Sequence, residues 1–316
     1  MNPELIKVLS NNPSLQKLPV NTRGRDWFVG DVHGEFAMLS RAMEAAKFEP
    51  SVDRLIGVGD LVDRGGQSFE VLKFFATNPW AHCTLGNHEV MALRGFQGLN
   101  RGYVSREDWR VFLTIPQQRE AVEHISKFPI ALEVPLRDGR TVGVIHAELP
   151  PWTTWRVVEK AKITEEGFHD KDEVELIACL LWARRHFKLA EWVRLDPTGK
   201  TAGWANRFRA SILLRPVLGI DLLISGHSAL EFDYRPLQVE NRLWIDTGSG
   251  YPGGRLTLVN PLDGCYVQVN ESTARLCKLP EPLALSTFEL PGNDTEVAVE
   301  LIRSLGKMHE LLYQRE

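Results

Sequence analysis

Apolar runs alternate with amphipathic segments along the first third of the chain. Residues 26–30, 54–60 and 81–87 are predicted to be short buried strands running up to polar residues, and residues 35–47 and 67–76 carry apolar side chains at helical spacing. Alternation of strand and helix predicts parallel strands joined by right-handed crossovers. The first part of the chain is therefore expected to form a parallel sheet.

From residue 130 the pattern changes to paired strands. IALEVPLRDGRTVGVIH, residues 130–146, places two apolar runs around Asp138 and Gly139, which is a hairpin signal. Further strand-like runs, spaced for antiparallel pairing, follow at residues 221–227, 242–248, 255–261 and 265–270. The mixture predicts the α/β class, with two mixed sheets forming a β-sandwich flanked by helices.

The same pattern divides the chain into three regions. Residues 1–22 look like a polar leader, residues 23–270 form the main domain, and residues 278–316 form a C-terminal extension that ends in a helix. A helical insertion at about 150–218 is rich in tryptophan. The insertion either adds to the core or forms a lid that shapes a substrate cleft.

Polar side chains lie at the ends of the predicted strands, where α/β proteins build their sites. Those at a strand end, or within two residues of one, are Asp31, Asp60, Asn87, His146 and His227, and His33 shares the turn of Asp31. A single Asp or Asn in such a position is usually a helix cap or turn former. The ordered set GDVHG, GDLVDRG and GNHE, each after a strand, rarely arises by chance, so these turns indicate a functional site.

The chemistry of this set indicates metal binding. Carboxylate, imidazole and amide oxygen together suit Mn, Fe or Zn better than a thiolate-binding metal, and Mn is the expected ion, with Fe or Zn as alternatives. Six ligands are too many for one catalytic metal with an open position, and Asp60 is well placed to bridge two ions. The sequence therefore predicts two divalent metal ions, bound by Asp31, His33, Asp60, Asn87, His146 and His227.

These motifs, with VIHAE, SGHS and IDTGSGYPGGRLTLV, resemble the serine/threonine phosphoprotein phosphatases of bacterial and phage type, within the calcineurin-like metallophosphoesterase superfamily. The resemblance covers about residues 20–270 and implies the metallophosphatase fold. It implies that one metal takes Asp31, His33 and Asp60, and that the other takes Asp60, Asn87, His146 and His227.

The resemblance also implies catalytic roles. His88 is matched to the general acid beside the leaving oxygen, Asp63 to the carboxylate that orients it, and Arg64 to an arginine that grips phosphate. LLWARRHF resembles the segment that supplies a second phosphate-binding arginine, so Arg184 is expected in that role with Arg185 in reserve.

The expected reaction is hydrolysis of phosphoserine or phosphothreonine monoesters by direct attack of a metal-bridging hydroxide. Related phosphodiesterases carry a second histidine where this chain has Ala229, and dinucleoside-polyphosphate hydrolases commonly carry Ala at the position of Asp63. Two alternatives stay open. One is a hydrolase of nucleotides, dinucleoside polyphosphates or other small phosphorylated metabolites, and the other is an inactive phosphate-binding scaffold.

Composition narrows the partners to a phosphoprotein or a small phosphoester. The net charge of -4 provides no basic field for nucleic acid, and no apolar stretch approaches the roughly 18 residues that span a bilayer. The four cysteines lack CxxC spacing, which is typical of a reducing cytoplasm. Nothing in the sequence indicates an oligomeric state.

Overall fold

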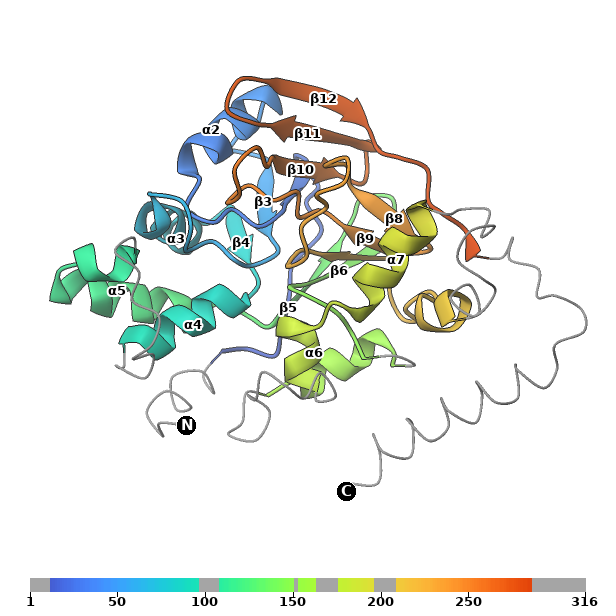
Figure 1. Ribbon diagram of the computed structural model, residues 1–316, viewed down its shortest axis with the longest axis horizontal. Coiled ribbons are helices and arrows are strands. Elements are labelled where there is room, and N and C mark those ends of the chain that lie inside the picture. Colours follow the sequence, from blue (N-terminus) through green and yellow to red (C-terminus); the bar gives the residue numbers. More distant parts are fainter. Residues whose placement is uncertain (1–11, 97–107, 151–152, 163–175, 196–208, 286–316) are drawn as a thin grey trace, which may run out of the picture.

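Two six-stranded sheets pack face to face in the computed structural model, which describes residues 12–96, 108–150, 153–162, 176–195 and 209–285 (Figure 1). Sheet A contains, in spatial order, β1 (Leu15–Lys17), β5 (Ala131–Pro135), β6 (Thr141–Ile145), β7 (Leu222–Ser225), β9 (Arg242–Trp244) and β8 (Leu237–Val239). Sheet B contains β12 (Ala274–Lys278), β11 (Cys265–Val269), β10 (Leu256–Asn260), β2 (Asp26–Val29), β3 (Arg54–Gly57) and β4 (Ala81–Cys83). Both sheets mix parallel and antiparallel pairs, so the predicted fold class is confirmed.

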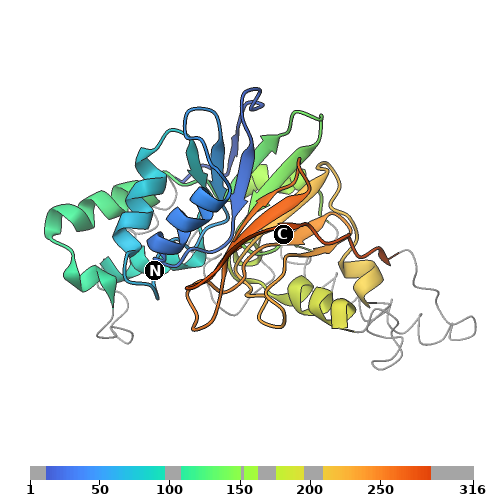
Figure 2. The same ribbon diagram turned by 90° about the horizontal axis from the view of Figure 1, so that it is seen from above.

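Helices cover the outer sides of the sheets. The named helices are α2 (Phe36–Ala45), α3 (Ser68–Thr77), α4 (Asn87–Phe96), α5 (Ile115–Ile125), α6 (Leu176–Trp182) and α7 (Arg185–Leu195), with 3-10 turns at η1 (Trp109–Phe112) and η2 (Trp155–Lys160). Seen from above, α2 to α5 lie on one side of the sheets and α7 lies on the other (Figure 2). No helix in the described part of the chain combines the length and apolar composition needed to cross a membrane.

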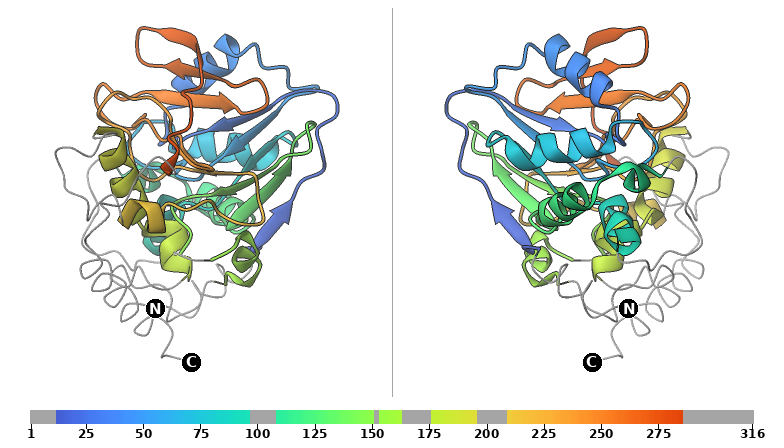
Figure 3. Two further views of the ribbon diagram at one scale, coloured as in Figure 1. Left: turned by 90° about the vertical axis from the view of Figure 1, so that its right-hand side faces the viewer. Right: turned by 90° about the vertical axis from the view of Figure 1, so that its left-hand side faces the viewer.

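The first half of the chain folds as its periodicity predicts. Strands β2, β3 and β4 pair in parallel, and α2 and α3 match the helices expected at residues 35–47 and 67–76. Helix α2 lies against β10, β11 and β12 of sheet B (Figure 3). Within β2, Phe28 faces the core between the sheets, whereas Trp27 and Val29 face the core beneath the helices. Because neighbouring side chains of a strand point to opposite faces, both faces of this strand are apolar and buried.

The hairpin predicted at residues 130–146 is confirmed, since β5 and β6 pair antiparallel around a turn with Gly139 at φ 89°. Antiparallel pairing of the four later runs is only partly right. Strands β10 and β11 do pair antiparallel, but β7 and β9 pair in parallel. The reason is β8, a short strand that the sequence analysis missed, which reverses at Glu240 (φ 51°) and brings β9 alongside β7.

The predicted regional boundaries of the chain need correction at both ends. Strand β1 lies inside the predicted polar leader, where it pairs in parallel with β5, and Leu18 just beyond it is buried. Strand β12 extends sheet B past the predicted domain end at residue 270. Both are edge strands with mostly exposed side chains, so neither carries the apolar alternation that reveals a strand in sequence. The helix predicted in the C-terminal extension lies outside the described residues.

The tryptophans of the insertion that the structure describes belong to the core. Trp155 is buried under sheet A, and its indole Nε1 donates to Glu133 Oε2 at 2.9 Å. Trp182 and Trp192 are partly buried and pack against apolar clusters. These three side chains favour the added-core interpretation over a lid. Trp152 and Trp204 lie outside the described residues.

Candidate metal centre

The six predicted metal ligands converge at one edge of the two sheets. Asp31 and His33 follow β2, Asp60 follows β3, Asn87 begins α4 after β4, His146 follows β6, and His227 follows β7. All are buried, with at most 6% of their surface exposed. Parallel strands end at a shared edge, so residues up to 196 positions apart come into contact there.

The three histidines present one ring nitrogen each to the centre of this site. The other nitrogen of each ring lies beside a backbone carbonyl: His33 Nδ1 is 2.9 Å from Val62 O, His146 Nδ1 is 2.9 Å from Val58 O, and His227 Nε2 is 3.0 Å from Trp182 O. A carbonyl oxygen only accepts hydrogen bonds, so these nitrogens carry the ring protons. The inward-facing nitrogens therefore carry lone pairs, as metal ligation requires.

Those lone pairs face oxygen atoms that also act as acceptors. Asn87 Oδ1 lies 2.8 Å from His146 Nε2 and 3.0 Å from His227 Nδ1, and Asp60 Oδ1 lies 3.3 Å from His146 Nε2. His33 Nε2 is buried without a hydrogen-bond partner and lies 3.7 Å from Asp60 Oδ2. Acceptors crowded in this way repel one another unless a cation lies among them. The residues present therefore fit a metal centre.

Two overlapping groups of donors share Asp60. One group is His33, Asp60 and His88, and the other is Asp60, His146 and His227. Within each group the atoms that could bind a metal lie within 4.8 Å of one another. A carboxylate common to both groups suits the bridging role predicted for Asp60. Asp31 joins the first group, since its Oδ2 lies 3.9 Å from His33 Nε2.

The buried carboxylates of the site also favour the binding of cations. Burial and the carboxylates of Asp246 and Asp60 raise the pKa of Asp31 well above its usual value, and burial raises the pKa of Asp246 to about 6. Burial lowers the pKa of His33 to about 3, which keeps this ring neutral and able to ligate. Buried like charges are costly without compensation, and divalent cations provide it.

Asp246 and Tyr251 lie in the loop after β9, and each interacts with a predicted site residue, Asp246 with Asp31 and Tyr251 with Arg64. The sequence places both in IDTGSGYPGG. Asp246 Oδ1 accepts a hydrogen bond from the Gly248 amide at 2.8 Å, which holds the turn. The ring of Tyr251 lies under the Arg64 guanidinium, 4.3 Å from its carbon. The loop therefore supports both the carboxylate cluster and a phosphate-binding candidate.

The site loops adopt a strained backbone. The described residues other than glycine with positive φ include five predicted site residues, at φ between 48° and 70°: His33, Asp60, Asp63, Arg64 and His227. This conformation costs about 1–3 kcal/mol at each such position, and it gathers where function requires a particular geometry. Gly59, at φ 100°, shows why these turns need glycine, since a Cβ there would lie 2.8 Å from His146 Nδ1.

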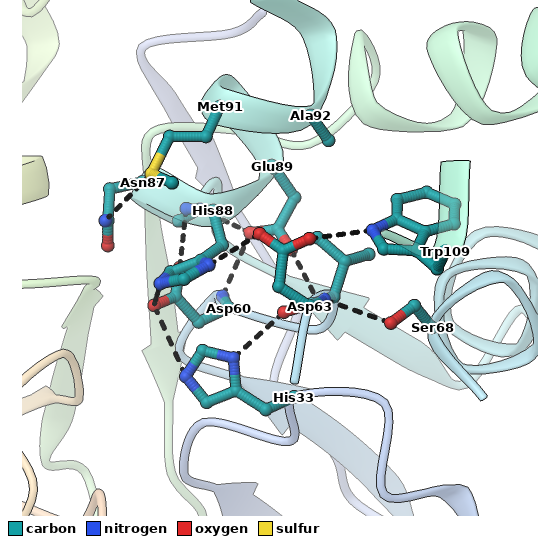
Figure 4. Close-up of polar contacts among 12 residues, drawn as sticks. His33, Asp60, Asp63, Ser68, Asn87, His88, Glu89, Met91, Ala92 and Trp109 are labelled. Atoms are coloured by element: carbon teal, nitrogen blue, oxygen red, sulfur yellow. Dashed lines mark hydrogen bonds and ion pairs between the residues drawn. The ribbon is translucent and has the colours of Figure 1, made fainter. Parts of the chain in front are cut away.

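His88 and Asp63 form a pair beside the shared carboxylate (Figure 4). His88 Nδ1 lies 2.7 Å from Asp63 Oδ2, and His88 Nε2 lies 3.8 Å from Asp60 Oδ2. Burial opposes protonation of His88, but Asp60 and Asp63 outweigh it and raise the pKa of the ring. His88 is therefore suited to carry a proton to the reacting group.

Trp109 and Glu89 support the site but were missed by the sequence analysis. The indole Nε1 of Trp109 donates to Asp63 Oδ1 at 2.8 Å, so both carboxylate oxygens of Asp63 are engaged. Glu89 is fully buried, and it accepts backbone N–H bonds from Asp60, Leu61, Val62 and Gly86 at 2.8–3.3 Å. Glu89 is the last residue of the GNHE motif, so the sequence could have indicated it as a site residue. No local sequence pattern indicates Trp109.

The two arginines predicted to bind phosphate lie in different loops, Arg64 between β3 and α3 and Arg184 between α6 and α7. Arg64 is exposed on the loop after Asp63. Arg184 reaches the loop of His227, where its Nη1 lies 3.4 Å from Ser228 Oγ. Burial lowers the pKa of His227, and the charges of His146 and Arg184 lower it further. Arg185 follows at the start of α7, and its backbone amide donates to Glu148 Oε2 at 3.1 Å. This geometry favours Arg184 over Arg185.

Comparison with known proteins agrees with the geometry. A family model described as calcineurin-like phosphoesterase matches residues 25–230, which include all six candidate ligands. Serine/threonine-protein phosphatase 2 of Escherichia coli (strain K12) is 36% identical over 243 residues, covering 75% of this chain and 94% of that protein. Serine/threonine-protein phosphatase 1 of Salmonella typhimurium (strain LT2) is 30% identical over 237 residues, covering 73% and 89%.

A third relative has a different activity. The symmetrical bis(5'-nucleosyl)-tetraphosphatase of Pseudomonas putida (strain W619) is 31% identical over 150 residues, covering 47% of this chain and 51% of that protein. The family match and the extent of the phosphatase matches lead to one conclusion: the chain belongs to the calcineurin-like phosphoesterase family.

Proposed function

We propose that this protein is a metal-dependent phosphomonoesterase that removes phosphate from phosphoserine and phosphothreonine. The observation that carries the proposal is the His88–Asp63 pair, with His88 Nε2 directed at the shared carboxylate Asp60. A serine or threonine alkoxide is a poor leaving group, so a proton donor at this position is needed for its release. The relatives named serine/threonine-protein phosphatases support this substrate class.

We expect Mn²⁺ at this centre, with Fe or Zn as alternatives, because mixed nitrogen and oxygen donors suit these ions better than thiolate-binding metals. The residues that would hold one cation are Asp31, His33 and Asp60, and those that would hold the second are Asp60, Asn87, His146 and His227. When bound, the cations would supply Lewis acidity and would lower the pKa of water, so that hydroxide is available near neutral pH to attack phosphorus.

The protein's own groups then orient the substrate and move the proton. His88 gives the proton on Nε2 to the departing serine or threonine oxygen, while Asp63 holds Nδ1–H and stabilises the charged ring. Arg64 and Arg184 bind the phosphoryl oxygens, because a planar guanidinium matches their geometry and balances their charge.

Dinucleoside polyphosphates are the second candidate substrate, favoured by the tetraphosphatase match. That match covers only about half of the tetraphosphatase, 51%. Asp63 bonds both His88 and Trp109, which holds the His88–Asp63 pair in place. Such a proton donor matters most for an alkoxide, because a phosphate leaving group needs less protonation. The observed contacts therefore favour the phosphomonoesterase.

Turnover measurements on Mn²⁺-loaded protein test the proposal. Phosphoserine and phosphothreonine peptides, p-nitrophenyl phosphate and diadenosine tetraphosphate should be compared by kcat/KM. We expect hydrolysis of the phosphopeptides and the nitrophenyl ester, with the tetraphosphate the poorest substrate. Preferential cleavage of the tetraphosphate would overturn the proposal, and metal binding without any hydrolysis would indicate an inactive scaffold.

We propose in addition that the enzyme works in the cytoplasm. Cys83, Cys265 and Cys277 are free thiols. Free thiols are typical of a reducing compartment.

A further inference from the structure

A groove runs from the Arg64 loop along the start of α3 and past η1. Its volume is about 520 Å³, and its walls include Arg64, Phe69, Trp109, Phe112 and Leu113. Helix α3 contributes Phe69 from its first turn, and the segment 109–113 forms the opposite wall. Three of the five are aromatic, and the remaining lining residues are Gly65, Gly66, Ser68, Glu70 and Gln117. The groove therefore offers an apolar patch within a partly polar surface, at the edge of a charged site.

The segment beside the groove exposes apolar side chains. Val111 is 56% exposed, Phe112 is 73% exposed and Ile115 is 66% exposed. They are three of the nine large hydrophobic residues that are exposed in the described part of the chain, and they fall within five consecutive positions. Single exposed apolar residues are ordinary, but a cluster beside a concave surface indicates a binding site.

The groove is continuous with the proposed catalytic site through two residues. Arg64, proposed to bind phosphate, lines the groove and directly follows Asp63 in the chain. Trp109 forms part of the wall, and its indole nitrogen donates to Asp63 Oδ1 at 2.8 Å. A ligand in the groove therefore lies beside the group that grips phosphate and the pair that protonates the leaving oxygen.

We propose that this groove is a specificity subsite that binds an apolar side chain of the substrate polypeptide, close in sequence to the phosphorylated residue. The inference rests on the proposed function. An extended peptide advances about 3.3–3.6 Å per residue, so a side chain up to about three positions from the phosphorylated residue reaches a groove that begins at Arg64. The exposed ring of Phe112 is available to contact the apolar side chain of the substrate, and Phe69 and Leu113 also line the groove.

A phosphopeptide series tests the subsite directly. Each peptide of the series contains one phosphoserine in an alanine background and one leucine. The position of the leucine differs from peptide to peptide, from three residues before the phosphoserine to three residues after it. We expect one or two of these positions to raise kcat/KM by about tenfold over the all-alanine peptide, as burial of a leucine side chain allows. In the Phe112→Ala variant, most of this increase in kcat/KM should disappear. Turnover of p-nitrophenyl phosphate should be unchanged.

Phe232→Ala is the matched control. Phe232 is 70% exposed, close to the 73% of Phe112, but lies near Arg194 and lines no part of the groove. The control variant should keep the full preference for leucine. Equal kcat/KM for all peptides, or a leucine preference that survives Phe112→Ala, overturns the subsite and leaves the proposed function intact. Hydrolysis of p-nitrophenyl phosphate without hydrolysis of any phosphopeptide overturns both.

Discussion

Replacing Asp63 with asparagine should disable the proposed general acid without disturbing the metal ligands. In the native protein Asp63 Oδ2 faces His88 Nδ1 at 2.7 Å, and Asp63 Oδ1 accepts from Trp109 Nε1 at 2.8 Å. An indole nitrogen can only donate, so the amide oxygen of the introduced asparagine must face Trp109. The NH₂ group of that amide then faces His88 Nδ1, which must become an acceptor, and the charged form of the ring loses its partner.

The expected size of the effect follows from these contacts. A hydrogen bond to a charged group contributes about 1.5–3 kcal/mol, and general acid catalysis contributes about 10²–10⁴-fold in rate. We therefore expect Asp63→Asn to lower kcat on a phosphoserine peptide by about 100-fold, or about 2.7 kcal/mol. The loss should be less than about tenfold on p-nitrophenyl phosphate, whose leaving group needs little protonation.

A second substitution tests the orientation argument itself. In Asp63→Asn/Trp109→Phe the amide is free to turn, so its oxygen can accept from His88 Nδ1–H. Activity on the phosphopeptide should recover by about three- to tenfold over Asp63→Asn, a non-additive result in a double-mutant cycle. Trp155→Phe is the control, because it removes a similar indole–carboxylate bond, 2.9 Å to Glu133, away from the site.

Two results would refute this reasoning. One is an Asp63→Asn variant with native activity on the phosphopeptide. The other is equal recovery, or none, when Trp109→Phe and Trp155→Phe are each added to Asp63→Asn. Metal content of every variant should be measured by elemental analysis, since a lost metal would lower activity for a different reason.

The remaining predictions concern the metals, the loop support and pH. EDTA should abolish turnover and Mn²⁺ should restore it, with Mn²⁺ at about 100 times its Kd adding about 2.7 kcal/mol to the free energy of unfolding; full activity of metal-free protein would contradict the mechanism. Glu89→Gln should lower stability in denaturant unfolding, by about 1–3 kcal/mol for each of the two backbone donors that then face an NH₂ group, and should weaken Mn²⁺ binding by about 10–100-fold; unchanged Mn²⁺ affinity would argue against loop support. Burial opposes ionisation of Asp53, but hydrogen bonds from Arg25 outweigh burial and lower the pKa of Asp53 below 3.8. The Arg25–Asp53 pair therefore stabilises the fold above about pH 4, and this stabilisation is lost as pH falls through the lowered pKa. The stability difference between native protein and Asp53→Asn should therefore shrink in denaturant titrations below pH 4, and a constant difference would count against the assignment.

Local sequence patterns were enough to predict the strands that carry the site and the identities of the candidate ligands. Asp31, Asp60 and Asn87 could be found because each follows a buried strand in a glycine-flanked turn. Helices α2 and α3 were found for a similar reason, since their apolar stripe repeats within ten residues. Such signals are local, because covalent spacing alone sets which side chains share a face.

Short elements at the sheet edges escaped this kind of inference. Strands β1, β8 and β12 are three to five residues long, and β1 and β12 are largely exposed. Helix α5, which begins at a capping box formed by Thr114 and Gln117, was also missed. The position of β1 is set by pairing with the distant β5, whereas β8 and β12 pair with the neighbouring strands β9 and β11. In segments this short, little of the information that fixes the strand lies in the segment itself.

The contacts between distant groups of the site could be established only from the folded chain. Trp109 contacts Asp63, which is 46 residues away in the sequence, and His227 contacts Asn87, which is 140 residues away. No sequence pattern links residues at these separations. The tautomers of the three metal-facing histidines depend on backbone carbonyls contributed by other loops. Such contacts form because packing the two sheets brings loop ends within hydrogen-bond distance, and that distance depends on the whole fold rather than on any local segment.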